Sequence, residues 1–572
     1  MKESHFTNNS CGGPISVYVK DGKISRIRPM AIDKNDMKPW TITDANGKKF
    51  SPPPKVTIQP YVMSERTRVY AEERIKYPMK RVDFDPEGER HPENRGKSGY
   101  ERISWEEALD IVTGEIKRVR ETYGPEGIAS MKPEHHNFGN VGYRLGAFTR
   151  FINILGTTQI EENPDSWEGW HWGATHTYGF YWRLGTIESY DLLDDALKYS
   201  DMIVYWSTDP NATCNAYSGQ ESVIWRQWLK ESGKKQVFID PFYNYTAATV
   251  GDKWISPRPG TDAAMILAIM HVWLQEDTYD KDYIAKRTIG FDEFKRYVLG
   301  EADGVPKTPQ WAAKITDLPA RNIKALAREW ASKKVQYFGS GFGGACRSAY
   351  ATEWTRLSVL LQAMQGLGKP GVSMGADCGG APYNASVYFP GYADPDGMLF
   401  LSRAAKKPAI NPVEQTISRP LFPDAILNPP IKWTGIGFCA HSLDEQFMKM
   451  SYPLPGQSEI HMLYRYGSSY IGTFCNGKRW VEAFQSPKLE FIVTQDCWWN
   501  NETRLADIVL PACTNMERND ISEFCNAGGY VADGSSACNY RVIVYQQKCI
   551  EPLYESKSDY KIFRLLSAKM GI

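Results

Sequence analysis

The sequence has no long hydrophobic run, no excess of charge of one sign and no secretion signal. Its apolar stretches fall short of the roughly 18 residues that a membrane-spanning helix needs. Lys plus Arg and Asp plus Glu each number 67, which argues against nucleic acid or an anionic membrane as the main partner. Because the N-terminus carries neither an apolar signal core nor a twin arginine, we expect a cytoplasmic protein.

Closely spaced cysteines are also missing. The 11 cysteines are scattered from Cys11 to Cys549 without a CxxC pair. This distribution is neither a disulfide framework nor a zinc or iron–sulfur ligand set, so most cysteines are expected to be small buried residues. Aromatic residues, in contrast, are plentiful, with 18 Trp and 32 Tyr. They suit stacking on a flat ligand as well as packing in a large core.

Short apolar runs alternate with amphipathic stretches along most of the chain, which predicts an α/β fold with doubly wound, mostly parallel sheets. Before them, Asp21-Gly22 between alternating apolar residues predicts a type I′ hairpin over 15–28, since both central positions need positive φ. Ser104 is expected to cap a helix. Strands are expected at 202–206, 237–239, 335–339, 460–466, 491–493 and 508–510, and helices at 261–275, 319–333, 351–365 and 558–569.

The expected domains follow the same pattern. The stretch from 366 to 458 holds many Gly and Pro and little periodicity, which is typical of irregular chain. We expect a small β-rich N-terminal domain over 1–75, a discontinuous α/β domain over 76–190 and 458–572, a dinucleotide-binding-like α/β domain over 191–412 and an irregular connection over 413–457.

Several expected strands end in small polar or acidic residues. In open parallel sheets, ligands bind beyond the carboxyl ends of the strands, where such side chains can hold ribose hydroxyls, guanine edges or phosphates. An ordinary turn has the same composition, and Asp262 either charges the first turn of a helix or presents a carboxylate to the N–H edge of a purine. The predicted cofactor-binding residues are Ser207, Asp209, Asp240, Gly260, Asp262, Gln495, Asp496 and Thr503.

Two further motifs carry weaker signals. Residues 339–344 match GxGxxG between a strand and a helix, the context of NAD-binding folds. The acidic residue that should end a second strand about 20 residues later falls instead in the helix expected at 351–365, which argues against NAD. His135 and His136 are adjacent, so at most one of them is expected to face a pocket.

Residues 163–172, Asn-Pro-Asp-Ser-Trp-Glu-Gly-Trp-His-Trp, have two interpretations. In the first, Ser166 caps a helix and the indoles are core. In the second, the Ser166 oxygen binds a hard, high-valent metal and Asp165 carries a proton beside it. These ten residues alone leave both interpretations open.

Residues 506–517, Ala-Asp-Ile-Val-Leu-Pro-Ala-Cys-Thr-Asn-Met-Glu, resemble the signature ADxxLPAxTxxE of molybdopterin oxidoreductases of the dimethyl sulfoxide reductase type. Asp-Pro after a strand, and then Pro-Gly-Thr-Asp opening a helix, are similar to the guanosine-binding pattern of that family. The resemblance covers the whole chain. Segments 135–136, 139–144, 163–172 and 388–392 narrow it to the pyrogallol–phloroglucinol transhydroxylase large subunits within the family.

The resemblance implies hydroxyl transfer between polyhydroxylated phenols, with two molybdopterin guanine dinucleotides holding one molybdenum, or tungsten in its place. It implies Ser166 as the protein ligand of the metal. His135, Asp165 and Tyr392 would be the catalytic acid–base groups, since an imidazole, a carboxyl and a phenol hold different protons at neutral pH. The substrate pocket would be lined by Tyr143, Arg144, Trp167 and Phe342.

Two departures from the family pattern bear on partners and completeness. Many relatives hold an iron–sulfur cluster around the first hairpin, where this chain has only Cys11, so we expect no cluster here. The resemblance instead implies a heterodimer with an iron–sulfur small subunit. The family continues into a C-terminal β-barrel domain beyond the position of Ile572, so that domain is expected to be missing and the chain to be a fragment or the product of a split gene.

Two alternative functions remain. A reductive dehydroxylase, or another molybdenum or tungsten oxidoreductase, would use the same scaffold. It needs external electrons, whereas transhydroxylation needs a tetrahydroxybenzene co-substrate and no net reductant. The other alternative is a truncated, cofactor-free assembly or binding subunit.

Overall fold

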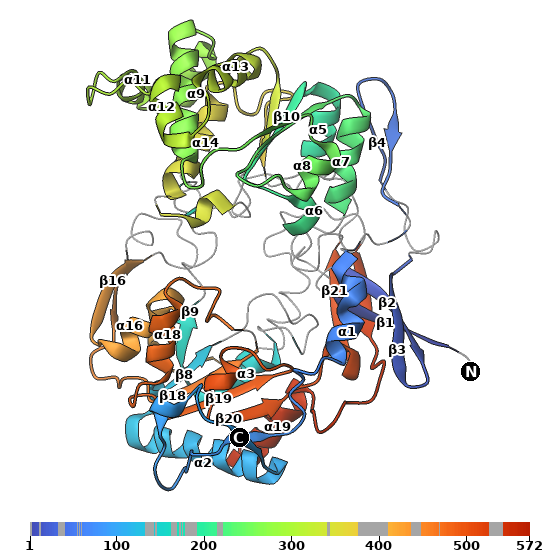
Figure 1. Ribbon diagram of the computed structural model, residues 1–572, viewed down its shortest axis with the longest axis vertical. Coiled ribbons are helices and arrows are strands. Elements are labelled where there is room, and N and C mark those ends of the chain that lie inside the picture. Colours follow the sequence, from blue (N-terminus) through green and yellow to red (C-terminus); the bar gives the residue numbers. More distant parts are fainter. Residues whose placement is uncertain are drawn as a thin grey trace.

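The computed structural model of the chain is organised around two large, mostly parallel sheets, and it has a smaller antiparallel sheet at the N-terminus (Figure 1). Statements below concern the residues that it describes. These are 3–10, 13–31, 40–53, 55, 58, 60–131, 142, 146–161, 169–170, 173, 176–177, 191–213, 221–339, 344–349, 351–375, 410–435, 448–467, 469–525 and 541–572.

The N-terminal sheet contains β1 (Ser4–Ser10), β2 (Gly13–Lys20) and β3 (Lys23–Pro29) in that order, all antiparallel. Asp21 and Gly22 join β2 to β3 with φ of 54° and 74°, so the type I′ hairpin prediction is confirmed. A second hairpin, β21 (Asp520–Cys525) with β22 (Arg541–Gln546), lies beside β1. Gln547 N donates to Thr7 O at 2.9 Å between them.

A five-stranded sheet organises the middle of the chain. Its neighbouring strands are all parallel, and the chain starts at the central strand, moves outward to one edge and then continues on the other side. The carboxyl ends of β10 and β13 therefore form a topological switch point. The order is β12 (Lys253–Ile255), β11 (Lys235–Ile239), β10 (Met202–Trp206), β13 (Val335–Phe338) and β14 (Met374–Gly375).

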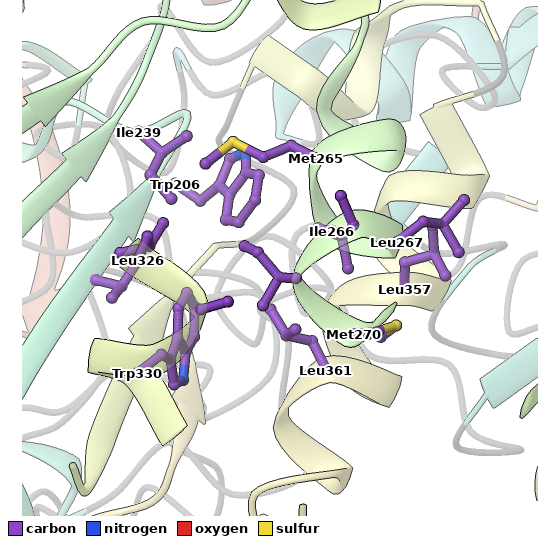
Figure 2. Packing of buried hydrophobic residues seen from close by; sticks show 14 of the residues in the cluster. Trp206, Ile239, Met265, Ile266, Leu267, Met270, Leu326, Trp330, Leu357 and Leu361 are labelled. Carbon is purple, nitrogen blue, oxygen red and sulfur yellow. The ribbon is translucent and has the colours of Figure 1, made fainter. Parts of the chain in front are cut away.

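Helices cover both faces of this sheet, because alternate strand residues point to opposite sides. One face packs on α5 (Leu192–Tyr199), α7 (Glu221–Glu231) and α8 (Tyr245–Val250). The other packs on α9 (Asp262–Glu276), α12 (Pro309–Thr316), α13 (Ala320–Ala331) and α14 (Ala351–Ala363). Figure 2 shows α9 at the centre of this second core, through Met265, Ile266, Leu267 and Met270 against Trp206, Ile239, Leu326, Trp330, Leu357 and Leu361.

The larger sheet has eight strands and is parallel over its first six. The last two strands are antiparallel. A second switch point lies between β8 and β18, where the chain order again reverses. The order is β15 (Thr416–Ser418), β9 (Thr158–Glu161), β8 (Ile128–Met131), β18 (Met462–Tyr466), β19 (Phe491–Asp496), β20 (Ile508–Pro511), β6 (Met79–Arg81) and β7 (Tyr100–Arg102).

This sheet is also covered on both faces. Met462, Tyr464 and Tyr466 pack towards α2 (Trp105–Tyr123), α3 (Ala147–Leu155) and α19 (Asp559–Met570). Leu463 packs towards α16 (Phe422–Leu427) and α18 (Gly477–Phe484). Ser104 caps α2 by accepting from Glu107 N at 3.1 Å, as predicted.

The prediction of an α/β fold with parallel-rich sheets is confirmed. The expectation of irregular chain over 413–457 is not met by the described part of that segment. It contains β15, α16 and the antiparallel pair β16 (Ile431–Gly435) and β17 (Met448–Tyr452). Elements this short show no clear periodicity in sequence. The domain boundaries stay a prediction. Among the helices that the structure describes, none has the length and apolar character to cross a membrane.

Candidate cofactor site

The sequence-predicted site residues divide into two halves. Eight lie outside the described residues, and their roles stay predictions: His135, Tyr143, Arg144, Asp165, Ser166, Trp167, Phe342 and Tyr392. The other eight, the predicted cofactor-binding residues, are described, and all but Thr503 lie at or shortly after the carboxyl ends of strands in the two large sheets.

Ser207 follows β10 at the first switch point. Its backbone is left-handed, with φ of 55°, a conformation that is uncommon outside glycine and recurs at ligand sites. Ser207 N donates to Ile239 O at 2.8 Å, and Ser207 Oγ accepts from Ala345 N at 2.9 Å. Ser207 therefore joins the end of β11 to the chain that follows β13.

Asp209 and Asp240 are held by the start of α8. Asp209 Oδ1 accepts from Thr246 Oγ1 at 2.6 Å and from Thr246 N at 3.1 Å. Asp240 accepts from Phe242 N at 2.8 Å and from Asn244 Nδ2 at 3.2 Å. Both carboxylates are thereby fixed at the strand ends rather than free to rotate into solvent.

Asp262 is the first residue of α9 and is buried. Its Oδ1 accepts from Trp206 Nε1 at 2.8 Å, so the last residue of β10 orients the carboxylate. Gly260, with φ of 77°, makes the turn before it. Burial raises the pKa of Asp262, and burial together with the charges of Asp209 and Asp262 raises the pKa of Asp240. A ligand edge rich in N–H donors, such as that of guanine, would relieve this repulsion.

Gln495 and Asp496 lie at the end of β19, the strand next to the second switch point. Gln495 Oε1 accepts from Tyr464 OH at 2.9 Å, and Gln495 Nε2 donates to Asp559 Oδ1 at 2.7 Å. Asp496 accepts from Trp498 N at 3.2 Å and from Asn500 Nδ2 at 2.8 Å. Burial raises the pKa of Asp496 to about 6.

Thr503 has a different position from the other predicted residues. Its Oγ1 donates to Asn500 O at 2.9 Å and accepts from Asn500 N at 2.6 Å. Thr503 is buried and is absent from the cavity wall described below. Its observed role is to hold the Asn500 turn, which in turn holds Asp496, and direct contact with a cofactor stays a prediction.

A cavity of about 620 Å³ opens at the carboxyl ends of β18, β19 and β20, next to α1 (Glu65–Val69). This volume lies within the range of roughly 300–1,000 Å³ that small-molecule sites occupy. The wall combines residues from the N-terminal region with the predicted pair Gln495 and Asp496. It includes Ser10, Glu65, Arg68, Tyr466, Gln495, Asp496, Cys513, Asn515, Arg518 and Asp559.

Arg518 contributes a buried guanidinium to this wall. Its guanidinium pairs with Asp520 through Nη1, while its Nε is buried without a hydrogen-bond partner among the described residues. Leaving a buried donor unsatisfied costs about 1–3 kcal/mol, and more when the group is charged. Because this atom has almost no accessible surface, it is not open to an occupant of the cavity, and the size and position of the cavity are what indicate a small-molecule site.

Buried ion pairs hold the signature residues 506–517 in place. Asp507 accepts from Arg95 Nη2 at 2.6 Å, from Arg81 Nη2 at 3.0 Å and from Ile492 N at 2.9 Å. Glu517 pairs with Arg74 at 3.0 Å, and it accepts from Thr514 N and from Leu553 N, both at 2.7 Å. These two acids hold β20 and the turn after it in place, so this part of the signature builds the cavity wall.

Sequence analysis missed Arg518 and Asp559 as members of the cavity wall. Arg518 is the residue directly after the signature, which is a weak positional signal. Asp559 resembles an ordinary acidic residue in the first turn of α19, capped by Ser558. Only the packing of distant segments brings the two together.

Two doubly wound, mostly parallel sheets with polar carboxyl ends define an α/β protein of the doubly wound class, in which ligands bind beyond the strand ends. The family model of molybdopterin oxidoreductases matches residues 74–569, and the chain belongs to this family. A second family model, "Pyrogallol hydroxytransferase large subunit-like, domain 1", matches residues 13–68. The predicted family and the prediction of an enzyme of this kind are thus confirmed, and family membership implies a molybdopterin cofactor with molybdenum.

The chain is 47% identical over 597 residues to the pyrogallol hydroxytransferase large subunit of Pelobacter acidigallici, an alignment that covers 99% of this chain and 68% of that protein. It is 31% identical to the dimethyl sulfoxide/trimethylamine N-oxide reductase of Rhodobacter capsulatus, over 88% of this chain and 58% of the relative. Among solved structures, acetylene hydratase from Pelobacter acetylenicus has the same fold. The TM-score is 0.58 at 19% identity, covering 95% of this chain and 69% of that one.

Proposed function

We propose that this chain catalyses molybdenum-dependent hydroxyl transfer between polyhydroxylated phenols, of the pyrogallol to phloroglucinol type. The observation that carries the proposal is the cavity of about 620 Å³ at the carboxyl ends of β18, β19 and β20, in a chain 47% identical to a pyrogallol hydroxytransferase large subunit. One ring gains a hydroxyl where a tetrahydroxybenzene co-substrate loses one, so the pair of rings needs no net reductant.

We assign one arm of a bis-molybdopterin guanine dinucleotide to each switch point. At the first, Asp240 and Asp262 would accept the N–H donors of a guanine edge, with Asp262 already oriented by Trp206. At the second, the cavity beyond β18, β19 and β20 would receive the other arm. When bound, the metal group accepts and returns the electrons that the ring chemistry requires. Ser166 is proposed as its protein ligand.

The remaining roles belong to residues outside the described part of the chain. His135, Asp165 and Tyr392 are proposed to deprotonate one phenol and to protonate a dearomatised ring, since their side chains differ in pKa. Tyr143, Trp167 and Phe342 would present ring faces to the substrate, and Arg144 would orient its oxygens. An iron–sulfur small subunit is the proposed partner, because the relative from Pelobacter acidigallici is named as a large subunit.

The test is to produce the full-length protein with its genetic neighbours in a host that makes molybdopterin and is supplied with molybdate. Phloroglucinol formed from pyrogallol and a tetrahydroxybenzene, without added reductant, would support the proposal. Turnover of the phenol only with external electrons would favour the dehydroxylase. A stable complex that lacks both metal and pterin would favour the cofactor-free assembly subunit.

A further inference from the structure

Arg68 is the cation that the N-terminal part of the chain brings to the cavity wall. It belongs to the last turn of α1, it lines the cavity of about 620 Å³, and it is exposed. The other cationic side chain among the described wall residues, Arg518, is almost wholly buried and pairs with Asp520. Arg68 has no carboxylate partner among the described residues, so its charge is open to an occupant of the cavity.

Trp498 holds the Arg68 guanidinium at this place. Arg68 Cζ lies 4.5 Å from the centroid of the Trp498 ring, and Trp498 Nε1 donates to Arg68 O at 2.8 Å. A cation over the face of an indole is attracted by the ring electrons. Trp498 is itself fixed, because its N donates to Asp496 Oδ1 at 3.2 Å. A guanidinium stacked on one face still presents N–H donors at its edge, in the fork geometry that matches phosphate oxygens.

Other residues of the wall carry the opposite charge. Glu65, Glu73, Asp496 and Asp559 also line the cavity. A small inorganic anion would be attracted by Arg68 and repelled by these carboxylates, so Arg68 alone does not make a phosphate site. A molecule that carries an anionic group on one part and N–H donors on another would match both kinds of side chain. A nucleotide has this chemistry.

We propose that Arg68, held on Trp498, binds the phosphate part of the molecule that occupies this cavity, while carboxyl groups of the wall receive the N–H donors of the same molecule. The inference deepens the proposed function and rests on it for the identity of the occupant, the second nucleotide arm of the cofactor. It makes the N-terminal segment a part of the binding site, because α1 supplies the one accessible cation among the described wall residues.

The first test labels arginine side chains with phenylglyoxal in the wild-type chain without cofactor and follows each arginine by peptide mass spectrometry. At a GDP concentration about ten times its Kd, labelling of Arg68 should slow about tenfold, since only the free protein reacts. Guanosine and inorganic phosphate at the same concentration should protect Arg68 much less. Arg504 is the matched control, because it is exposed, lies 5.7 Å from the ring of Trp499 and is absent from the described cavity wall. Its labelling should not change. Equal labelling of Arg68 with and without GDP would overturn the proposal, and so would equal protection by inorganic phosphate and GDP.

The second test measures how fast the cofactor-loaded complex releases guanine nucleotide during dialysis. Arg68→Ala should release it about tenfold faster than the wild type or more, because charge-assisted hydrogen bonds to the phosphate are lost. Arg68→Lys should retain it to an intermediate degree, since an ammonium keeps the charge without the fork. Arg504→Ala should match the wild type, and equal release from Arg68→Ala and the wild type would contradict the role of Arg68. A wild-type complex that protects Arg68 from phenylglyoxal yet turns over no phenol would instead contradict the proposed function and leave this inference standing.

Discussion

Asp507 Oδ2 accepts a hydrogen bond from Arg95 Nη2 at 2.6 Å, and neither side chain is exposed to solvent. Arg81 shares the same carboxylate from the other side. Two guanidinium groups are therefore buried around one acid of the family signature. The arrangement ties β20 to β6 and to the segment before β7, at the edge of the sheet that carries the cavity.

This relationship predicts the effect of Asp507→Asn. Loss of the negative charge would leave the buried Arg95 without a carboxylate partner among the described residues and Arg81 with Asp83 alone, so the free energy of unfolding should fall by about 3–5 kcal/mol. Urea unfolding measures it. The matched control is Asp317→Asn, since Asp317 pairs with Arg258 on the surface, where such a pair is worth about 0–1 kcal/mol. Equal losses in the two variants would refute the structural role of Asp507.

Asp496 predicts a pH dependence. Burial raises its pKa to about 6 in the folded protein, above the usual value for an unfolded chain. Below pH 4 the Asp496 carboxyl is protonated in both the folded and the unfolded state, so its burial does not lower the free energy of unfolding there. As the pH rises from 4 to 6, Asp496 loses its proton first in the unfolded state, which lowers the free energy of unfolding. The decrease is complete above pH 6.

The expected difference appears on comparing the wild type with Asp496→Asn in cofactor-free protein. From pH 4 to pH 7, the free energy of unfolding of the wild type should fall relative to that of the variant. The upper bound is about 3 kcal/mol, and the observed fall should be smaller because Asp496 is partly open to the cavity. Urea unfolding at several pH values gives the two curves. Parallel curves would show that Asp496 keeps an ordinary pKa.

Local signals in the sequence predicted much of this fold. The Asp21-Gly22 hairpin follows from turn chemistry, and the strands and helices around Met202 and Asp262 follow from apolar runs and a helix start. The cavity wall did not follow, because Tyr466, Arg518 and Asp559 lie far apart in the chain and each has an ordinary local context. The burial of Arg518 depends on how β18, β20 and α19 pack. No local pattern encodes a contact of that kind.

The same distinction between local sequence signals and tertiary packing applies to the candidate site. Strand-end positions such as Asp240 and Asp262 were predictable, since parallel sheets place ligands there. The partners that orient them were not predictable. Trp206 is simply an apolar residue in sequence, and only the structure shows its indole N–H on Asp262.

The orientation of Asp262 leads to a prediction about the cofactor. Asp262→Asn keeps an oxygen that can accept from Trp206 Nε1, but it removes the negative charge offered to a guanine edge. Loss of one charge-assisted hydrogen bond, about 1.5–3 kcal/mol, should weaken retention of the guanine nucleotide by tenfold or more. Guanine nucleotide released per chain by acid treatment measures it. Asp277→Asn, at the other end of α9, should retain the wild-type amount.

Ser166 allows the two interpretations of residues 163–172 to be separated. If its oxygen binds the metal, Ser166→Ala should lose most of the molybdenum while the chain keeps its fold, because the remaining ligands no longer include a protein oxygen. If Ser166 only caps a helix, the substitution should cost about 1 kcal/mol of stability and leave the metal content unchanged. Ser104→Ala is the matched control, since Ser104 is an observed helix cap. Metal analysis of both variants, together with their thermal unfolding, therefore decides the matter: a Ser166→Ala protein that behaves like Ser104→Ala would remove Ser166 from the metal site.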